Sequence, residues 1–328
     1  MKLKFAVIGG DRRAVHLAEL LQREGRRVSA FALERAALPE EIARAEHLQA
    51  ALYGADAVVL PLPAEKGGLL NAPYARLPCE VRELTETVWP GQIVFGGLFT
   101  EDWRLWALKS GVQLVDWMRC PSFVTGNAAL TAEGAVGLLL QESERSLAGS
   151  RVLLGGYGRI GRVLAQRLRG MGASVTVAAR REESRAEAAA LGFAADDFSF
   201  APGANGLSAA DDFSCAPGAN GFSAADCSCA PGANGSSAAD GLCAAGAYDF
   251  VVNTVPARVF GEELLCCLPE TALLLELASP PGGFDRNLAE NLGLRVMAAP
   301  GLPGRSAPRT AAELMLREIE RTMKEERE

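Results

Sequence analysis

The sequence predicts an α/β protein made of two doubly wound, Rossmann-like domains, each with a parallel sheet, and a cleft between them. Short apolar runs of strand length alternate with helical segments along most of the 328 residues. Such alternation is typical of parallel sheets that helices cover on both faces. Two of the runs end in glycine-rich turns, at residues 9–10 and 155–161, and a long apolar segment at 125–145 separates the two halves.

The first half opens with an apolar run at residues 3–8, a glycine turn and a helical segment at 14–23. Further strands are expected at 28–32, 57–60, 93–95 and 112–115. We expect residues 1–128 to form a substrate-side domain that the amphipathic C-terminal segment, residues 306–328, completes. Ligands of such sheets bind beyond the carboxyl ends of the strands, so the residues after the first strand are candidates for the substrate site: Gly9, Gly10, Asp11 and Arg12. A tight turn without a ligand is an equally good interpretation of Gly9-Gly10.

Residues 125–145 are predicted to form a long helix that leads into the second half. Thr131 and Glu133 lie near its start, where two domains would face each other, and either side chain could line a cleft. The alternative is structural, with Thr131 as a cap and Glu133 interacting favourably with the positive end of the helix.

The second half, residues 129–305, carries the most informative motif. An apolar run at 152–154 enters a G-x-G-x-x-G turn, an amphipathic segment follows, and a β-rich run at 174–178 closes the unit. The first glycine makes the tight turn, the second lets a pyrophosphate approach the backbone, and the third lets helix and strand pack closely. The residues predicted to bind a dinucleotide here are Gly156, Tyr157, Gly158, Arg159, Ile160 and Gly161.

The end of the second strand in this unit distinguishes NADP from NAD. An NAD site usually has an acidic residue at this point, which accepts hydrogen bonds from the ribose. Here the strand is followed by Arg180 and Arg181, whose guanidinium groups suit a 2′-phosphate. The sequence therefore favours NADP over NAD. The alternative is that Glu182 or Glu183 binds the ribose of NAD.

Later strands are expected at 250–253, 273–277 and 294–298, and each is followed by a polar or glycine-rich turn. In a doubly wound sheet these turns lie on the cofactor edge. The first turn contributes the predicted cofactor-binding residues Asn253, Thr254, Val255 and Pro256. Asp285 belongs to the second turn, and Arg305 directly follows the third.

A repeat interrupts the nucleotide domain. The hexapeptide APGANG begins at Ala201, Ala216 and Ala230, within a segment of low complexity at 194–240. Pro-Gly and Asn-Gly are turn signals, and the few apolar residues cannot bury enough area to offset the ordering of the chain. We expect a disordered or loosely turned loop. A repetitive binding element is the weaker alternative.

Composition argues for a soluble enzyme. The chain is 49% hydrophobic with a formal charge of −7, which gives no reason to expect a nucleic acid as a partner. No apolar run reaches the roughly 18 residues of a membrane span, and no secretory signal precedes the first strand. A cytoplasmic location is expected. Eight cysteines include no C-x-x-C pair, and the two histidines, His16 and His47, lie far from them in sequence, so neither disulfides nor a metal site are expected.

Taken together, these motifs resemble the dipicolinate synthase A-subunit family. The resemblance covers nearly the whole chain except the repeat, and the glycine turn alone is generic to dehydrogenases. The matching segments are residues 6–13, 127–135, 155–161, 252–256, 277–285 and 300–311. The family implies a nicotinamide-dependent oxidoreductase that forms pyridine-2,6-dicarboxylate from a dihydrodipicolinate-type intermediate of the lysine pathway in sporulating bacteria. It also implies a partner, a flavoprotein-like B subunit, and leaves a homo-oligomer open.

That reaction needs cations for two carboxylates and a base for one proton. Arg12, Arg13 and Arg305 are the candidate clamps, with Arg12 the first choice because it follows the turn after the first strand. A solvated surface charge is the alternative for each, and for Arg13 it is the favoured interpretation. Asp11, Glu133 and Asp285 are the candidate bases.

Two other classes of function remain. One is a 2-hydroxyacid or alanine-type dehydrogenase, although the 2-hydroxyacid type usually has a late catalytic histidine and this chain has none after residue 47. The other is a non-catalytic nucleotide-binding subunit.

Overall fold

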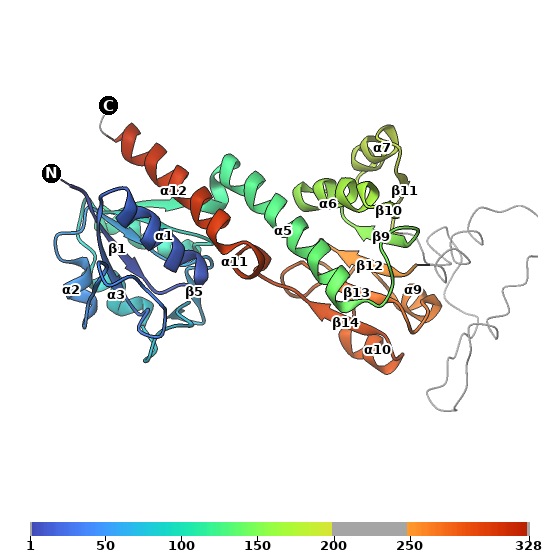
Figure 1. Ribbon diagram of the computed structural model, residues 1–328, viewed down its shortest axis with the longest axis horizontal. Coiled ribbons are helices and arrows are strands. Elements are labelled where there is room, and N and C mark those ends of the chain that lie inside the picture. Colours follow the sequence, from blue (N-terminus) through green and yellow to red (C-terminus); the bar gives the residue numbers. More distant parts are fainter. Residues whose placement is uncertain (1, 199–247, 327–328) are drawn as a thin grey trace, which may run out of the picture. The chain divides into compact units, whose positions relative to one another are not determined.

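The computed structural model describes residues 2–198 and 248–326 (Figure 1). The chain divides into two compact units. The first unit is Met1–Leu130 with Gly301–Glu328, and the second is Thr131–Pro300. Each unit contains a six-stranded sheet in which all neighbouring strands are parallel, and the predicted fold class is confirmed for both.

The sheet of the first unit has the strand order β3-β2-β1-β4-β7-β8. The chain order of the strands reverses between β1 and β4, which is the topological switch point of a doubly wound sheet. A short antiparallel hairpin, β5 with β6, lies outside this sheet. The strands are β1 Lys4–Ile8, β2 Arg27–Phe31, β3 Ala43–Arg44, β4 Ala57–Val59, β5 Glu65–Lys66, β6 Leu69–Leu70, β7 Ile93–Gly96 and β8 Gln113–Asp116.

Alternating residues of β1 supply two hydrophobic cores, one on each face of the sheet. Phe5 and Val7 belong to one cluster, whereas Ala6 and Ile8 belong to the other. This is why the strand is a continuous apolar run rather than an alternating one. The helical segments of the unit up to α5, which crosses into the second unit, are α1 Arg12–Arg23, α2 Leu48–Leu52, α3 Val81–Thr87, α4 Glu101–Ser110, the 3₁₀ turn η1 Trp117–Arg119 and α5 Pro121–Glu142.

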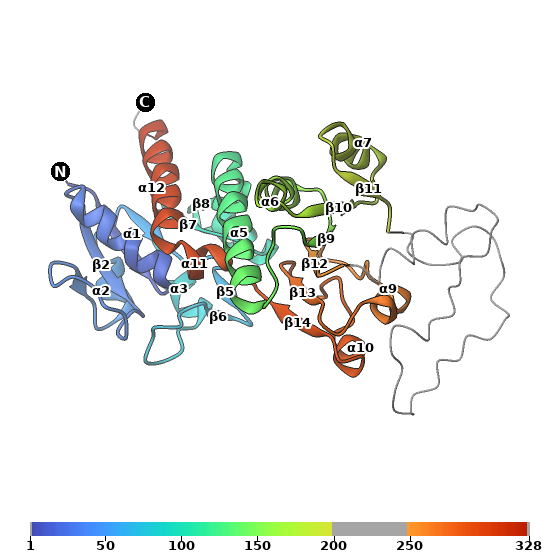
Figure 2. The same cartoon turned by 45° about the vertical axis from the view of Figure 1, so that its right-hand side comes forward.

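The C-terminal segment returns to the first unit as α11 (Leu302–Ser306) and α12 (Pro308–Glu325). Helix α12 lies beside α1 in both views (Figures 1 and 2). Its apolar face, with Met315 and Ile319, belongs to the same core cluster as Phe5 and Leu17. The helix therefore forms part of the core on one face of the first sheet.

The second sheet has the order β11-β10-β9-β12-β13-β14. Its switch point lies between β9 and β12, so the carboxyl ends of these two strands mark the expected position of a dinucleotide. The strands are β9 Arg151–Gly155, β10 Ser174–Ala178, β11 Ala194–Asp196, β12 Phe250–Asn253, β13 Leu273–Glu276 and β14 Arg295–Ala298, and the helices are α6 Arg159–Gly170, α7 Glu182–Ala190, α9 Glu262–Cys267 and α10 Arg286–Asn291.

Two expectations about element boundaries were wrong. Helix α5 begins at Pro121 rather than near residue 125, because proline is well suited to the first turn of a helix. Residues 194–196, which we assigned to the low-complexity loop, form β11 and pair with β10. Three residues are too few for periodicity to show, so only the pairing partner identifies this strand. The remainder of the repeat prediction lies outside the described residues.

Among the described helices, α5 is the one long and apolar enough to cross a membrane by length and composition. Half of its most apolar window is buried within the protein, and the core helices of soluble proteins pass the same test. This helix alone is weak support for a membrane span.

Candidate functional site

The glycine turn of the second unit joins β9 to α6 at the carboxyl edge of the sheet. Gly156 has a left-handed φ of +95°, and its N–H donates to the carbonyl of Ala178 at 2.8 Å. A Cβ on Gly161 would lie 2.2 Å from the carbonyl oxygen of Gly156, far inside van der Waals contact. The fold itself therefore requires the first and third glycines, one for its backbone conformation and one for the approach of α6.

Gly158 differs, because a Cβ there would meet nothing within 4 Å. This residue is the N-cap of the 12-residue helix α6 and makes no side-chain cap hydrogen bond. Open space in front of an uncapped helix N-terminus suits a pyrophosphate, whose charge the N–H groups and the helix dipole stabilise. Arg159 is exposed in the first turn and Ile160 is half-buried. These residues fit a dinucleotide.

The side chain of Tyr157 belongs to the packing beneath the turn. Tyr157 is 2% exposed, its ring centroid lies 6.3 Å from that of Phe193, and the guanidinium of Arg162 lies 5.6 Å from its centroid. Burial raises the pKa of the phenol above its ordinary value, and Glu187 nearby raises it further. The hydroxyl finds no hydrogen-bond partner among the described residues. Only the backbone of Tyr157 is therefore available to a dinucleotide.

Arg180 and Arg181 follow β10 and are both exposed. Arg181 is the N-cap of α7, while Glu182 and Glu183 occupy the first turn of that helix. Acidic residues in a first turn interact favourably with the helix dipole, which accounts for these two glutamates without a ribose. Two exposed guanidinium groups thus stand where an NAD site usually has a carboxylate.

A third arginine, which the sequence did not single out, supports this strand end. Nη1 of Arg185 donates to the carbonyl oxygens of Ala179 at 2.8 Å and of Arg180 at 2.7 Å. Arg185 therefore fixes the backbone of Arg180. The only signal in the sequence is its spacing of four residues from Arg181, which places the two on one side of a helix.

Asn253, at the end of β12, is completely buried and fully engaged. Its Nδ2 donates to the carbonyl of Val255 at 2.8 Å and to Oε1 of Glu276 at 2.6 Å. Its Oδ1 accepts from the N–H of Val255 at 3.1 Å. The side chain thus shapes the turn that follows β12 rather than facing solvent.

The turn after β12 is anchored to the glycine turn. Oγ1 and N–H of Thr254 both donate to the carbonyl of Gly155 at 2.8 Å. A Cβ on Gly156 would lie 2.4 Å from that hydroxyl oxygen. Val255 is half-buried and Pro256 is exposed. The structure thus brings the predicted residues of β12 against the glycine turn, at the switch point of the sheet.

Glu276, at the end of β13, was not among the site residues predicted from the sequence. Its carboxylate holds the backbone of the turn that follows β13. Its Oε1 accepts from the N–H of Ala278 at 2.9 Å, and its Oε2 accepts from the N–H of Gly283 at 2.6 Å. The turn delivers Asp285, an exposed residue whose Oδ1 caps α10 through the N–H of Leu288 at 3.1 Å. Asp285 therefore lies at the carboxyl edge of the sheet and also has a structural role.

Glu133 lies elsewhere in the second unit. Its carboxylate is 66% exposed and 3.6 Å from Nη1 of Arg167, in the last turn of α6. Arg167 is about 12 Å along α6 from its first residue at 1.5 Å per residue. This position, toward the end of α6 away from the glycine turn, gives no support to Glu133 as a base beside the cofactor.

In the first unit, the chain's own loop covers the turn after β1. The N–H of Gly9 donates to the carbonyl of Phe31 at 2.8 Å, and the N–H of Gly10 donates to the carbonyl of Asn71 at 3.0 Å. A Cβ on Gly9 would lie 2.9 Å from the Cβ of Ala72. Backbone carbonyls already accept from both N–H groups, which favours the tight turn without a ligand over a substrate site at Gly9 and Gly10.

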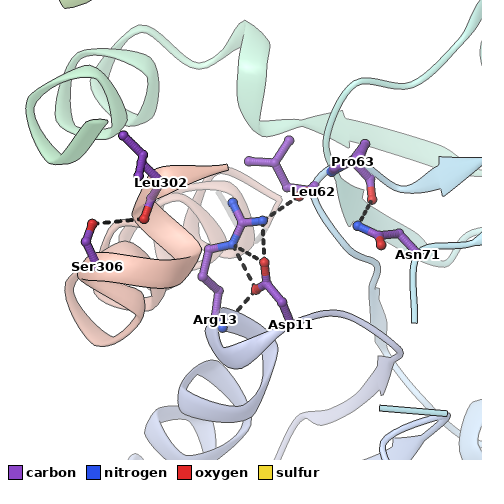
Figure 3. A network of polar contacts seen from close by, with 7 residues as sticks. All are labelled: Asp11, Arg13, Leu62, Pro63, Asn71, Leu302 and Ser306. Atoms are coloured by element: carbon purple, nitrogen blue, oxygen red, sulfur yellow. Dashed lines mark hydrogen bonds and ion pairs between the residues drawn. The ribbon is translucent and has the colours of Figure 1, made fainter. Parts of the chain in front are cut away.

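The next residues form an ion pair in which Arg13 is buried and Asp11 is half-buried (Figure 3). Nε of Arg13 donates to Oδ1 of Asp11 at 2.9 Å, and Nη2 donates to Oδ2 at 2.8 Å. Nη2 also donates to the carbonyl of Leu62. Arg13 is 5% exposed, so the expectation of a solvated surface charge was wrong. Asp11 also accepts from the N–H of Arg13 at 3.0 Å as the N-cap of α1, which leaves its carboxylate heavily engaged.

Arg12 and Arg305, predicted from opposite ends of the chain, come together in the first unit. Both residues are exposed. Nη1 of Arg12 donates to the carbonyl oxygen of Arg305 at 3.4 Å. Two cationic side chains therefore begin from neighbouring points at the carboxyl edge of the first sheet.

Groups of three or more potential metal ligands are absent from the described part of the chain.

Two family models match different parts of the chain. Residues 4–118 match the N-terminal domain of the dipicolinate synthase A-subunit. Residues 128–201 match the NAD binding domain of D-isomer specific 2-hydroxyacid dehydrogenases. The second match agrees with the glycine turn and indicates a nicotinamide cofactor in a dehydrogenase-like subunit.

Comparisons along the full length agree. The dipicolinate synthase A-subunit of Bacillus subtilis (strain 168) is 23% identical in an alignment of 331 positions, which covers 98% of this chain and 96% of the relative. The crystal structure of the dipicolinate synthase A-subunit from Bacillus halodurans superposes with a TM-score of 0.75 at 23% identity, covering 98% of this chain and 97% of that one. An L-alanine dehydrogenase gives a TM-score of 0.55 at 12% identity, covering 95% and 86%. The resemblance predicted from the motifs is confirmed.

Proposed function

We propose that this chain is the nucleotide-binding subunit of a dipicolinate-forming oxidoreductase. In this proposal the second unit binds NADP(H), and the first unit contributes the cations that bind a small dicarboxylate. The observation that carries it is the uncapped N-terminus of α6 behind Gly158, with open space in front of it, in a chain that matches the dipicolinate synthase A-subunit from end to end.

Cofactor choice depends on the end of β10. Arg180 and Arg181 replace the usual acidic residue, and Arg185 holds the carbonyl of Arg180. A 2′-phosphate would accept charge-assisted hydrogen bonds from exposed guanidinium groups. We therefore propose NADP as the preferred cofactor and NAD as the weaker ligand. When bound, the nicotinamide exchanges a hydride with the substrate.

The chain's own residues have three tasks in the proposed reaction. Arg12 and Arg305 bind the two carboxylates of a dihydrodipicolinate-type substrate. The backbone turns after β9 and β12 orient the cofactor. Asp285 is the proposed base, because it lies at the carboxyl edge of the second sheet and the cap of α10 takes up its Oδ1 alone. The carboxylate of Asp11 is instead paired with Arg13, and Glu133 lies away from the glycine turn, near Arg167. Loss of one hydride and one proton converts the dihydropyridine ring to the aromatic product.

The proposed setting follows from the relatives. Both dipicolinate synthase relatives are A-subunits, which supports an assembly with a second, flavoprotein-like B subunit. A homo-oligomer of this chain is compatible with that assembly. We propose that the complex acts in the cytoplasm of sporulating bacteria, on an intermediate that branches from the lysine pathway, without nucleic acid or membrane partners.

Co-expression of this chain with the B subunit, followed by a dipicolinate assay with each cofactor, tests the proposal. NADP(H)-dependent formation of dipicolinate is expected. A reaction that instead consumes alanine or a 2-hydroxy acid would replace the proposal with the dehydrogenase alternative. Dipicolinate formation without cofactor turnover would assign this chain a non-catalytic role.

A further inference from the structure

The Asp11–Arg13 ion pair is partly buried, and the residue that separates its two members in sequence, Arg12, is exposed. The Arg13 side chain is 7% exposed and the Asp11 side chain 31%. Replacing a buried pair with well-packed apolar residues is often neutral or stabilising, so stability alone does not explain why charges occupy this position. Its contacts suggest a more specific role.

The pair joins three segments that are distant in sequence (Figure 3). Asp11 caps α1, and Arg13 donates to the carbonyl of Leu62 in the loop after β4. Gly304, in α11, packs directly on the pair, because a Cβ there would lie 2.6 Å from Oδ2 of Asp11 and 2.9 Å from Nε of Arg13. No side chain fits between α11 and the two charges.

Both exposed arginines are attached to this junction by a single peptide bond. Arg12 lies between Asp11 and Arg13 in sequence, and Arg305 follows Gly304. Any shift of the ion pair relative to α11 changes the separation of the two backbone positions from which these side chains extend. The contact of Arg12 with the carbonyl of Arg305, at 3.4 Å, depends on the same separation.

We propose that the Asp11–Arg13 pair is a positioning unit for an anion clamp formed by Arg12 and Arg305, and that its placement selects ligands with two carboxylates over ligands with one. This inference rests on the proposed function, which supplies the dicarboxylate substrate. A monocarboxylate engages one arginine and is insensitive to their separation, whereas a rigid dicarboxylate needs both groups at one distance. The ratio of the two affinities therefore reports positioning rather than charge.

The test uses isothermal titration of the full chain with pyridine-2,6-dicarboxylate and pyridine-2-carboxylate. Three variants perturb the pair in different ways. Arg13→Lys keeps the charge but loses the planar fork, Asp11→Asn keeps a capping side chain but removes the charge, and Gly304→Ala adds one methyl group and removes no polar atom. Matched controls are Arg309→Lys, an exposed arginine of α12, and Gly137→Ala, where a Cβ meets nothing within 4 Å.

Each folded variant is expected to lose roughly tenfold in affinity for the dicarboxylate, the loss of about one hydrogen bond to a charged group. Affinity for the monocarboxylate and for NADP(H) should stay within about twofold, because NADP(H) binds in the other unit, and the controls should match the unaltered protein. If Arg13→Lys or Asp11→Asn fails to fold, Gly304→Ala decides alone.

An unchanged ratio of the two affinities in the variants would overturn the positioning role and leave the dicarboxylate site in place. Unchanged dicarboxylate affinity in Arg12→Ala would overturn the clamp itself. If the unaltered protein binds neither pyridine acid, the proposed substrate class fails and the positioning role fails with it.

Discussion

Replacing Gly158 with alanine should weaken dinucleotide binding by roughly a hundredfold without unfolding the protein. The φ of −85° at Gly158 is accessible to alanine, and a Cβ there meets nothing within 4 Å. Alanine is a poorer N-cap than glycine by roughly 0.5–1 kcal/mol. Reduced freedom of the unfolded chain offsets this by about 0.4–1 kcal/mol. The free energy of unfolding should therefore change by less than about 1 kcal/mol.

The effect on binding should be much larger. The new methyl group would occupy the open space in front of α6 that the pyrophosphate needs. Hydrogen bonds to a charged group contribute roughly 1.5–3 kcal/mol each, so the loss of two corresponds to about 3 kcal/mol or more, or roughly a hundredfold in Kd.

Gly161→Ala is the matched contrast. Its Cβ would lie 2.2 Å from a backbone carbonyl oxygen, which no rotation of a side chain can relieve. Overpacking of this kind destabilises a protein by about 1–3 kcal/mol, so this variant should lose stability and cofactor binding together.

Urea denaturation gives the free energy of unfolding of both variants, and titration of NADPH fluorescence gives Kd. Wild-type affinity in Gly158→Ala would refute the assignment of the phosphate site to this turn. A large loss of stability in the same variant would show that Gly158 serves the fold.

Three further predictions concern single residues. Arg180→Ala should weaken NADP(H) binding by roughly tenfold, because one charge-assisted contact is lost, and should leave NAD(H) binding unchanged. Equal affinity of the unaltered protein for the two cofactors would contradict the assignment of Arg180 to the 2′-phosphate. Burial and the nearby Glu320 raise the pKa of Glu24, so folding favours its neutral carboxyl, and this contribution to stability is lost as the pH rises through the folded pKa. Glu24→Gln should therefore raise the unfolding temperature at about pH 7 and leave it unchanged at about pH 3. An equal rise in unfolding temperature at both pH values would argue for an effect of packing alone. Burial, and then the carboxylates of Glu83, Glu34 and Glu80, raise the pKa of Cys79 to about 11. Folding therefore favours the neutral thiol, and its contribution to stability is complete below the unfolded pKa of about 9 and is lost as the pH rises toward 11. Peptide mapping after alkylation at about pH 8.5 should find Cys79 unmodified while the exposed Cys266 reacts.

Much of the fold could be predicted because the strands of a covered parallel sheet are short, wholly apolar runs. The run at 174–178 and that at 250–253 coincide with β10 and β12. The glycine spacing predicted the tight turn between β9 and α6, because the backbone of Gly156 and the close approach of Gly161 each set a local requirement. Local chemistry was sufficient wherever an element's partners are its neighbours in sequence.

The parts that could not be predicted depend on long-range contacts. The sequence does not show that Arg13 is buried, because its partners include the carbonyl of Leu62, 49 residues away. The contact between Arg12 and Arg305 spans 293 residues. The carboxylate of Glu276 binds Asn253 only because β12 and β13 are adjacent in the sheet. Charged residues in such networks look the same in sequence as solvated ones.

The most direct test is the stoichiometry of hydride transfer in the reconstituted complex with the B subunit. Reduction of NADP⁺ to NADPH is followed alongside the amount of dipicolinate formed from a dihydrodipicolinate-type substrate. The proposed function predicts that the two amounts are equal and that both fall together in Gly158→Ala. Dipicolinate formation that continues at the same rate when the cofactor is withheld, or in the Gly158→Ala complex, would contradict it.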